Sequence, residues 1–407
     1  FLFSSLFLMW RCFYCFVLLF LFFATSYLKF NFYDEHRYIY PNKEQNAVSN
    51  GRLKWKLADS PRVVSEFSSE VDEEWIPVMK YSTITFCVPF DAFDAYADKF
   101  IIELEGGYKA MIKLMEKQSL FDRALRTITF DPYSNEGTER NEAGGYQAMP
   151  ELAAWHVDRI LGFYRKPPIT SRYVSNKLLY PSFINSLLPD YQIAVTVHAW
   201  VDQLEKYDPS TTVMQYIVED QLEMPANDNM KEFVLQISDI LVFDFLVDDH
   251  DRRAEKNWVM HNGLYLSWDN GLGWHHGPFG SHSCIDILCG SNKWRTYSGV
   301  TETNNVPCKK TCVFRKSTVD LLHDIGPNAK EHEKLGWRLK EKLRENEAEL
   351  FPLFHFGIYY SDESCSEMVR YESESFFVGL NERAQKLLSH IDTCISKHGA
   401  DIVIQSS

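Results

Sequence analysis

Two aspartates, Asp251 and Asp269, lie eighteen residues apart in a segment whose pattern suits phosphoryl transfer. Asp251 is in a polar loop after a predicted buried helix, and Asp269 follows a predicted β-hairpin with the turn Asn262-Gly263. Asn-Gly is a preferred pair for a two-residue type I′ turn, so the hairpin returns the chain and lets both carboxylates face one cleft. Phosphoryl transfer needs one carboxylate near the acceptor hydroxyl and one on the metal ion that bridges the phosphates.

A lysine-bearing strand and an acidic helix start supply the other charges that this chemistry needs. Lys109 and Lys113 are four residues apart in a predicted strand, so they share one face of it. Lys113 stands between apolar neighbours, which suits the base of a cleft where a lysine meets phosphates. Glu151, in the first turn of the next predicted helix, can pair with this lysine or bind the metal directly. Without the rest of the sequence, Lys113 and Glu151 could equally well be two exposed charges on the protein surface.

Motifs of other enzyme classes are missing or weak. No Gly-x-Gly-x-x-Gly and no Walker A sequence precedes the lysine strand, so the usual phosphate loops of protein kinases and P-loop proteins are absent. A hydrolase would need a motif such as Gly-x-Ser-x-Gly, which is also absent. A glycosyltransferase remains an alternative, because Asp249-His250-Asp251 is an Asp-x-Asp sequence that can hold the metal of a nucleotide sugar.

The elements that must position these residues change in character along the chain. Short β-rich runs are predicted at Thr83–Val88, Phe100–Leu104, Lys109–Leu114, Trp258–His261 and Leu264–Trp268. Helices are predicted at Pro150–Leu161, Met230–Val247, Thr318–Asp324, Lys330–Leu350 and Phe376–His398. Residues 170–230 have no clear pattern and are interpreted as an insert. This order predicts an α+β fold in two lobes, a β-rich N-lobe at about 76–170 and a helical C-lobe at about 171–405.

Composition permits a large core and argues against nucleic acid as a partner. Of the 407 residues, 45% are hydrophobic and 15% are aromatic, so disorder is not expected. The formal net charge of −14 repels a phosphate backbone.

The N-terminal residues predict targeting to a membrane or to the secretory pathway. Residues 12–28 are uncharged and mostly apolar, a length between that of a secretory signal and that of a spanning helix. We therefore expect a signal anchor or a cleaved signal peptide at residues 1–28, followed by a stem at 29–75. Six of the nine cysteines lie in the C-terminal third, which indicates disulfides in an oxidising compartment rather than a zinc site with finger spacing.

Several segments, in the right order, resemble one family. They are Gly106-Gly-Tyr-Lys-Ala-Met-Ile-Lys, Glu151-Leu-Ala-Ala-Trp-His-Val-Asp-Arg-Ile-Leu-Gly-Phe with the later Pro167-Pro168, Phe243-Asp-Phe-Leu, Asp251-Arg, Asp269-Asn-Gly-Leu-Gly, Cys312-Val-Phe-Arg-Lys-Ser-Thr and His390-Ile-Asp-Thr-Cys-Ile-Ser-Lys-His-Gly. Together they resemble the Golgi secretory-pathway atypical kinases, the group of the four-jointed kinases, the Golgi casein kinase and a xylosyl kinase. The resemblance covers roughly residues 80–405 and implies a two-lobed, atypical protein-kinase-like fold.

The resemblance also implies roles for single residues and for cofactors. Lys113, with Lys109 as a second candidate, would hold the phosphates of ATP, and Glu151 and Asp269 would bind Mn²⁺ or Mg²⁺. Asp251 would orient the acceptor hydroxyl. Cys312 and Cys394 would form a disulfide that fixes the C-terminal helix. Asn257 is the preferred further metal ligand, because Lys256 stands where a ligand of a second metal is expected.

These roles imply a kinase that transfers the γ-phosphoryl group of ATP to Ser or Thr of secreted or extracellular-domain proteins. A xylose kinase of proteoglycans is an alternative acceptor class. Because Lys256 stands where a metal ligand is expected, a pseudokinase that activates a partner kinase is a further alternative. The expected location is the Golgi lumen, as a single-pass type II membrane protein or as a secreted protein after cleavage. A homodimer, or a heterodimer with a related kinase, also fits the resemblance.

Overall fold

A computed structural model of the chain describes residues 61–90, 99–115, 148–179, 190–206, 216, 222, 224–247, 249, 258–268, 289–290, 309–351, 356–360 and 368–406. The predicted membrane segment at 1–28 lies outside these ranges, as do Asp251, Lys256, Asn257 and Asp269. Within them, no helix has both the length and the apolar character needed to cross a membrane.

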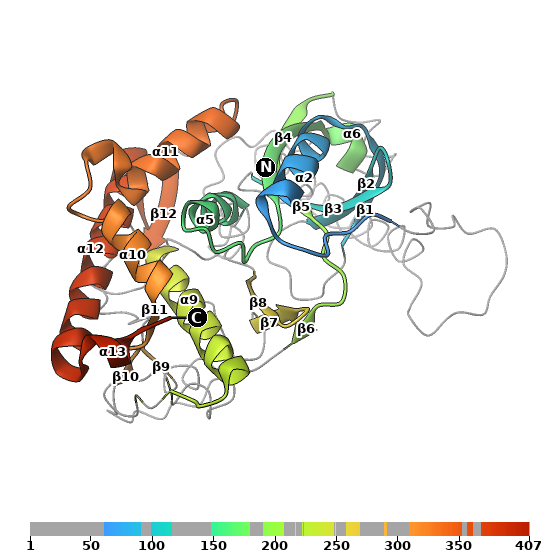
Figure 1. Ribbon diagram of the computed structural model, residues 1–407. Helices are drawn as coiled ribbons and strands as arrows, with labels where there is room; N and C mark the ends of the chain where they lie inside the picture. Colours follow the sequence, from blue (N-terminus) through green and yellow to red (C-terminus); the bar gives the residue numbers. More distant parts are fainter. Residues whose placement is uncertain are drawn as a thin grey trace, which may run out of the picture.

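Five strands form one antiparallel sheet in the N-terminal part of the described chain (Figure 1). Their order across the sheet is β1 (Ile84–Pro89), β2 (Lys99–Leu104), β3 (Tyr108–Leu114), β5 (Gln192–Ala199) and β4 (Ile169–Ser175). Gly106 and Gly107 both have positive φ, which permits the tight turn that joins β2 to β3. The three predicted strands in this region are confirmed.

The sheet takes in residues beyond the predicted N-lobe boundary near 170. Strands β4 and β5 come from the stretch interpreted as an insert, and they complete the sheet beside β3. In β5 all positions after Gln192 are buried: Val195 and Val197 enter the core of the sheet, and the alternate positions Thr196 and His198 are buried as well. Helix α2 (Ser69–Tyr81) begins within the predicted stem and packs Trp75 and Met79 into the core of the sheet.

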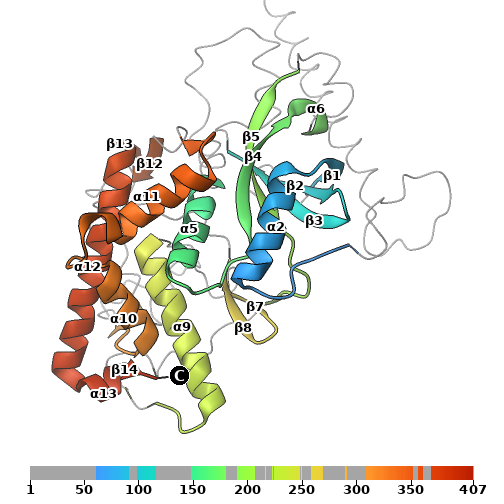
Figure 2. The ribbon, with the colours of Figure 1, turned by 45° about the horizontal axis from the view of Figure 1, so that its top comes forward.

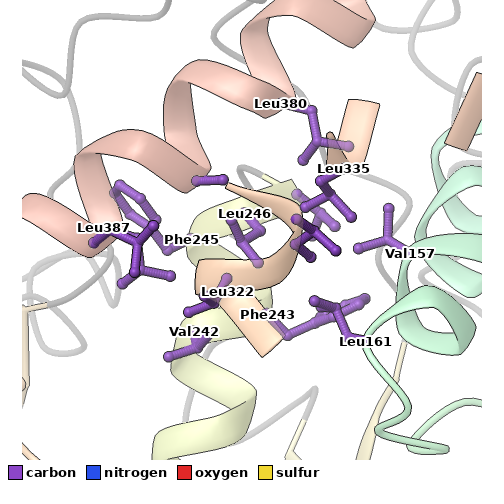
Figure 3. Close-up of a cluster of buried hydrophobic side chains, with 14 of the residues drawn as sticks. Val157, Leu161, Val242, Phe243, Phe245, Leu246, Leu322, Leu335, Leu380 and Leu387 are labelled. Atoms are coloured by element: carbon purple, nitrogen blue, oxygen red, sulfur yellow. The ribbon is translucent and has the colours of Figure 1, made fainter. Parts of the chain in front are cut away.

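Helix α5 (Ala148–Ile160) connects the sheet with the helical part of the chain (Figure 2). Its predicted apolar stripe contributes Ala153, Val157 and Leu161 to a core with α9 (Asp228–Val247). Figure 3 shows this cluster, in which side chains of α5 and α9 meet Leu322, Leu335, Leu380 and Leu387. Burial of each such side chain contributes roughly 1.5–3 kcal/mol, so α5 is held firmly against the helices.

The C-terminal part is mostly helical, as predicted. Its elements include α10 (Lys316–Ile325), η2 (Glu331–Glu333), α11 (Leu335–Asn346), α12 (Ser373–His398) and α13 (Ala400–Val403), with the short strands β11 (Phe314–Arg315) and β14 (Ile404–Gln405) paired in parallel. Two further hairpin-like pairs join β9 (Cys289–Gly290) to β10 (Lys309–Lys310) and β12 (Phe356–Tyr360) to β13 (Met368–Glu372).

The predicted hairpin before Asp269 is confirmed. Strands β7 (Trp258–His261) and β8 (Leu264–Ser267) pair in antiparallel fashion, and β6 (Glu205–Lys206) adds a third strand. Asn262 and Gly263 both have positive φ, as a type I′ turn requires.

The end of α11 fastens the helical part to the sheet. Glu347 is buried, and its carboxylate accepts hydrogen bonds from the Thr170 hydroxyl and from the backbone N–H and hydroxyl of Ser171 on β4. Lys80 of α2 and His156 of α5 each bring a nitrogen within 3.7 Å of the same carboxylate. Burial lowers the pKa of His156, which favours the neutral imidazole.

Cys312 and Cys394 form a disulfide, with a Cα–Cα distance of 5.4 Å that is ordinary for such a bond. Both residues are buried in the core that contains α12. Cys87 on β1 is a free thiol.

Candidate active site

Lys113 and Glu151 form a buried ion pair at the junction of the sheet and α5. The Lys113 ammonium contacts Oε1 of Glu151, and the two residues are only 3% and 2% exposed. Lys113 is brought there by β3, and Glu151 by the first turn of α5. Removing two charges from water is costly, so a buried ion pair does not by itself indicate a gain in stability. Buried charged groups in a cleft often serve binding or catalysis, so we consider this role for Lys113 and Glu151.

The pair lines a pocket of about 300 Å³, which is the lower end of the size range of small-molecule sites. Its polar wall carries Lys99, Lys113, Lys166, Glu151 and His198. Its apolar wall carries Phe90, Met111, Pro167, Ile169, Ala199, Trp200, Val201, Leu204 and Trp268. Among the described lining residues, three lysines stand against one carboxylate, which favours an anionic ligand, and the apolar wall offers a surface to a flat organic group.

The end of β8 is held at this pocket. Ser267, which lines it, donates its backbone N–H to the carbonyl oxygen of Arg165 at 2.8 Å and accepts a hydrogen bond from the Lys166 ammonium at 3.1 Å. Trp268 also lines the pocket. Asp269 is the next residue in the sequence after Trp268.

Arg165 and Lys166 belong to the linker between α5 and β4, and this linker is also bound to α5. The carboxylate of Asp158, which is fully buried, accepts the backbone N–H of Arg165 at 3.0 and 3.1 Å and pairs with Arg159. Burial raises the pKa of Asp158, and the charge of Arg159 opposes that rise. Through these bonds, the helix that carries Glu151 and the strand that leads to Asp269 are fixed to one short linker.

Lys109, the second predicted phosphate residue, lies near the pocket in a different setting. Its ammonium is 4.0 Å from the centroid of the Trp200 ring, a cation–π contact with a residue of the pocket wall. Burial lowers the pKa of Lys109, whereas the charge of Asp202 raises it.

Three functional candidates were not found from the sequence. Thr196 and His198 lie two residues apart on β5, and both are buried near the ion pair. A threonine and a histidine at this spacing within an otherwise apolar strand are a signal that could have found them. Lys166 is 2% exposed, and its position just before Pro167-Pro168 gave no comparable signal.

The remaining predicted site residues, Asp251, Asn257 and Asp269, lie outside the described residues. The segment that carries Asp251 leaves the C-terminal end of α9. At that end, Asp249 is buried and donates its backbone N–H to the carbonyl oxygen of Asp244 at 2.9 Å.

The sequence was compared with family models and with curated proteins. No protein-family model matches the chain. Human "Pseudokinase FAM20A" is 23% identical over 75% of this chain and 56% of its own length. The mouse protein of the same name is 23% identical over 62% of this chain and 48% of its own length. The chain therefore spans about half the length of the curated relatives it matches.

Solved structures share the fold. A crystal structure of the Golgi casein kinase superposes with a TM-score of 0.50 and 16% identity, covering 83% of this chain and 79% of that one. A second structure of that kinase, with Mn/ADP bound, gives a TM-score of 0.50 and 17% identity over the same shares of the two chains. This chain is similar in sequence to FAM20A pseudokinases and shares the fold of the Golgi casein kinase. The predicted resemblance and the kinase-like, mixed α and β fold are thereby confirmed.

These similarities point to both an enzyme and a pseudokinase. The curated relatives are named pseudokinases, whereas the solved structures are those of a kinase. Identity below 25% carries only the fold to this chain, so activity has to be argued from its own residues.

Proposed function

We propose that this chain is an ATP-dependent phosphotransferase that uses a divalent metal ion, Mn²⁺ or Mg²⁺, and transfers the γ-phosphoryl group to a hydroxyl. The carrying observation is the buried ion pair of Lys113 and Glu151, which lines a lysine-rich pocket with an apolar wall. The two charges together match the lysine and carboxylate that phosphoryl transfer uses to hold nucleotide phosphates and metal.

The residues present fit a bound metal–nucleotide complex. Glu151 offers a buried carboxylate inside the pocket, and carboxylate oxygens suit Mn²⁺ and Mg²⁺. Asp269 would be the second ligand, since it directly follows the pocket residue Trp268. When bound, the metal neutralises charge on the phosphates. The Golgi casein kinase structure with Mn/ADP supports this assignment.

The chain's own groups would mainly position the reactants. Lys113 would hold the phosphates, the apolar wall would hold the base, and Asp251 would accept a hydrogen bond from the acceptor hydroxyl and orient it. Alignment of this kind lowers the barrier because the bound groups no longer lose freedom in the reaction. Lys166 and Arg165 would keep the end of β8 at the pocket.

For location and acceptor, we propose the Golgi lumen or the secretory pathway, with residues 1–28 as the anchor or signal and residues 76–405 as the kinase domain. Ser or Thr of secreted or extracellular-domain proteins is the proposed acceptor, and a proteoglycan xylose is the alternative. The protein acceptor is put first because the Golgi casein kinase, one of the solved structures, is named for a protein substrate.

A pseudokinase that binds nucleotide and activates a related kinase is the second candidate. It is favoured by the names of the curated relatives and by Lys256, which stands where a metal ligand is expected. It is opposed by the presence of Lys113, Glu151, Asp251 and Asp269 in one chain.

An assay with γ-labelled ATP and Mn²⁺ separates these candidates. We expect the chain to label casein-like peptides or cadherin repeats more than xylosides, and we expect Asp269→Ala to abolish labelling without unfolding. Asp320→Ala is the matched control, because Asp320 is an exposed carboxylate on α10 that pairs with Lys316. Binding of ATP and Mn²⁺ by the wild-type chain without turnover on any of the three acceptor classes would replace the kinase by the pseudokinase.

A further inference from the structure

His198 lies beside the carboxylate of Glu151, at the oxygen Oε2. Its Nδ1 atom is 3.4 Å from Oε2 of Glu151, whereas the Lys113 ammonium contacts Oε1. The three side chains are buried and line the same pocket. Lys113 comes from β3 and His198 from the neighbouring strand β5, so each oxygen of the carboxylate faces a nitrogen supplied by the sheet.

Thr196 fixes the other side of the imidazole ring. Its hydroxyl oxygen is 2.9 Å from Nε2 of His198, and both residues are buried on β5. The carbonyl oxygen of Lys113, another acceptor for this hydroxyl, is farther away at 3.5 Å. A neutral imidazole has one donor and one acceptor nitrogen, so a hydroxyl that donates to Nε2 leaves the proton on Nδ1, facing Glu151.

We propose that His198 is a positioning residue for Glu151, holding the second carboxylate oxygen so that the group keeps one orientation in the pocket. The inference rests on the proposed binding of a metal–nucleotide complex by this pocket. Without the imidazole, Oε2 of Glu151 loses this contact, and the carboxylate is less restrained about its terminal bond, whose rotation is soft. Groups that orient a metal ligand change metal affinity by about 10- to 100-fold when they are removed.

Two amide substitutions separate this role from simple packing. Asparagine places its amide nitrogen near the position of Nδ1, and glutamine reaches toward that of Nε2. We expect His198→Asn to keep the affinity for Mn/ADP within a few-fold of wild type. We expect His198→Gln and His198→Leu to weaken it about 10-fold or more. Calorimetric titration of the full chain with ADP at fixed Mn²⁺, and with Mn²⁺ at fixed ADP, measures both affinities.

His156→Gln is the matched control. His156 is also buried and also lies near a glutamate, Glu347, but it is on the part of α5 that faces β4 and α11 rather than among the pocket residues. We expect this control to lower the melting temperature and to leave Mn/ADP affinity unchanged. Equal affinities of all three His198 variants and wild type would overturn the role of His198 alone. Absence of Mn/ADP binding by the wild-type chain would overturn the proposed function and this inference with it.

Discussion

Replacing Lys113 with methionine is expected to abolish nucleotide binding and to lower the free energy of unfolding by roughly 3–5 kcal/mol. The methionine keeps much of the side-chain volume but leaves Glu151 buried without its main counter-charge. A buried charge that loses its partner carries the full cost of desolvation. Calorimetric titration with Mn/ADP and unfolding in urea measure the two effects separately.

The double variant Lys113→Met with Glu151→Gln distinguishes loss of function from loss of fold. Removing both charges removes the desolvation cost, so we expect much of the lost stability to return. Nucleotide binding is not expected to return, because neither the cation for the phosphates nor the carboxylate for the metal is restored. A double variant that binds Mn/ADP like wild type would show that the ion pair is only structural.

Removing the disulfide is expected to have the largest effect on stability among changes outside the pocket. Cys312 and Cys394 are 82 residues apart, and closing a loop of this length stabilises the folded state by about 4.5 kcal/mol in the chain-entropy model. We expect the variant with both cysteines changed to alanine to lose free energy of this order in urea unfolding. Alanine avoids burying a new hydroxyl in the core that surrounds both residues.

Cys87→Ala is the control for the loss of a thiol without the loss of a cross-link. Cys87 is a free cysteine on β1, and burial raises the pKa of its thiol to about 12, so it carries almost no charge at neutral pH. We expect this change to cost far less than the double substitution. If reduced wild type and the double variant unfolded at the same urea concentration as the oxidised protein, Cys312 and Cys394 would not be cross-linked in solution.

The local parts of the fold could be predicted from the sequence because each carries its own signal. The Asn262-Gly263 turn fixes the β7–β8 hairpin, and an apolar spacing of three to four residues marks α5 and α9. Lys113 and Glu151 were each found in this way, on a strand and in a first helical turn. Their direct contact joins residues 38 positions apart, and the sequence left it as one of two alternatives, the other being a direct bond from Glu151 to the metal.

The parts that were missed depend on contacts distant in sequence. Strand β5 alternates Ile193, Val195 and Val197 with the polar Thr196 and His198, but this short signal lies in a stretch without further pattern. Helix α2 resembles a polar stem because its first half is acidic and Pro77 interrupts the apolar run from Trp75 to Met79. Lys166 and His198 acquire their places only when the sheet meets the end of β8 and the start of α5.

A crystal structure of the chain with Mn²⁺ and ADP tests the central claim most directly, because manganese can be located by its anomalous scattering. We expect the manganese peak at ligand distance from a carboxylate oxygen of Glu151, with the ADP phosphates at the Lys113 ammonium and the base against the apolar wall that includes Ala199 and Leu204. A nucleotide bound elsewhere, or a manganese ion with no contact to Glu151, would contradict the account.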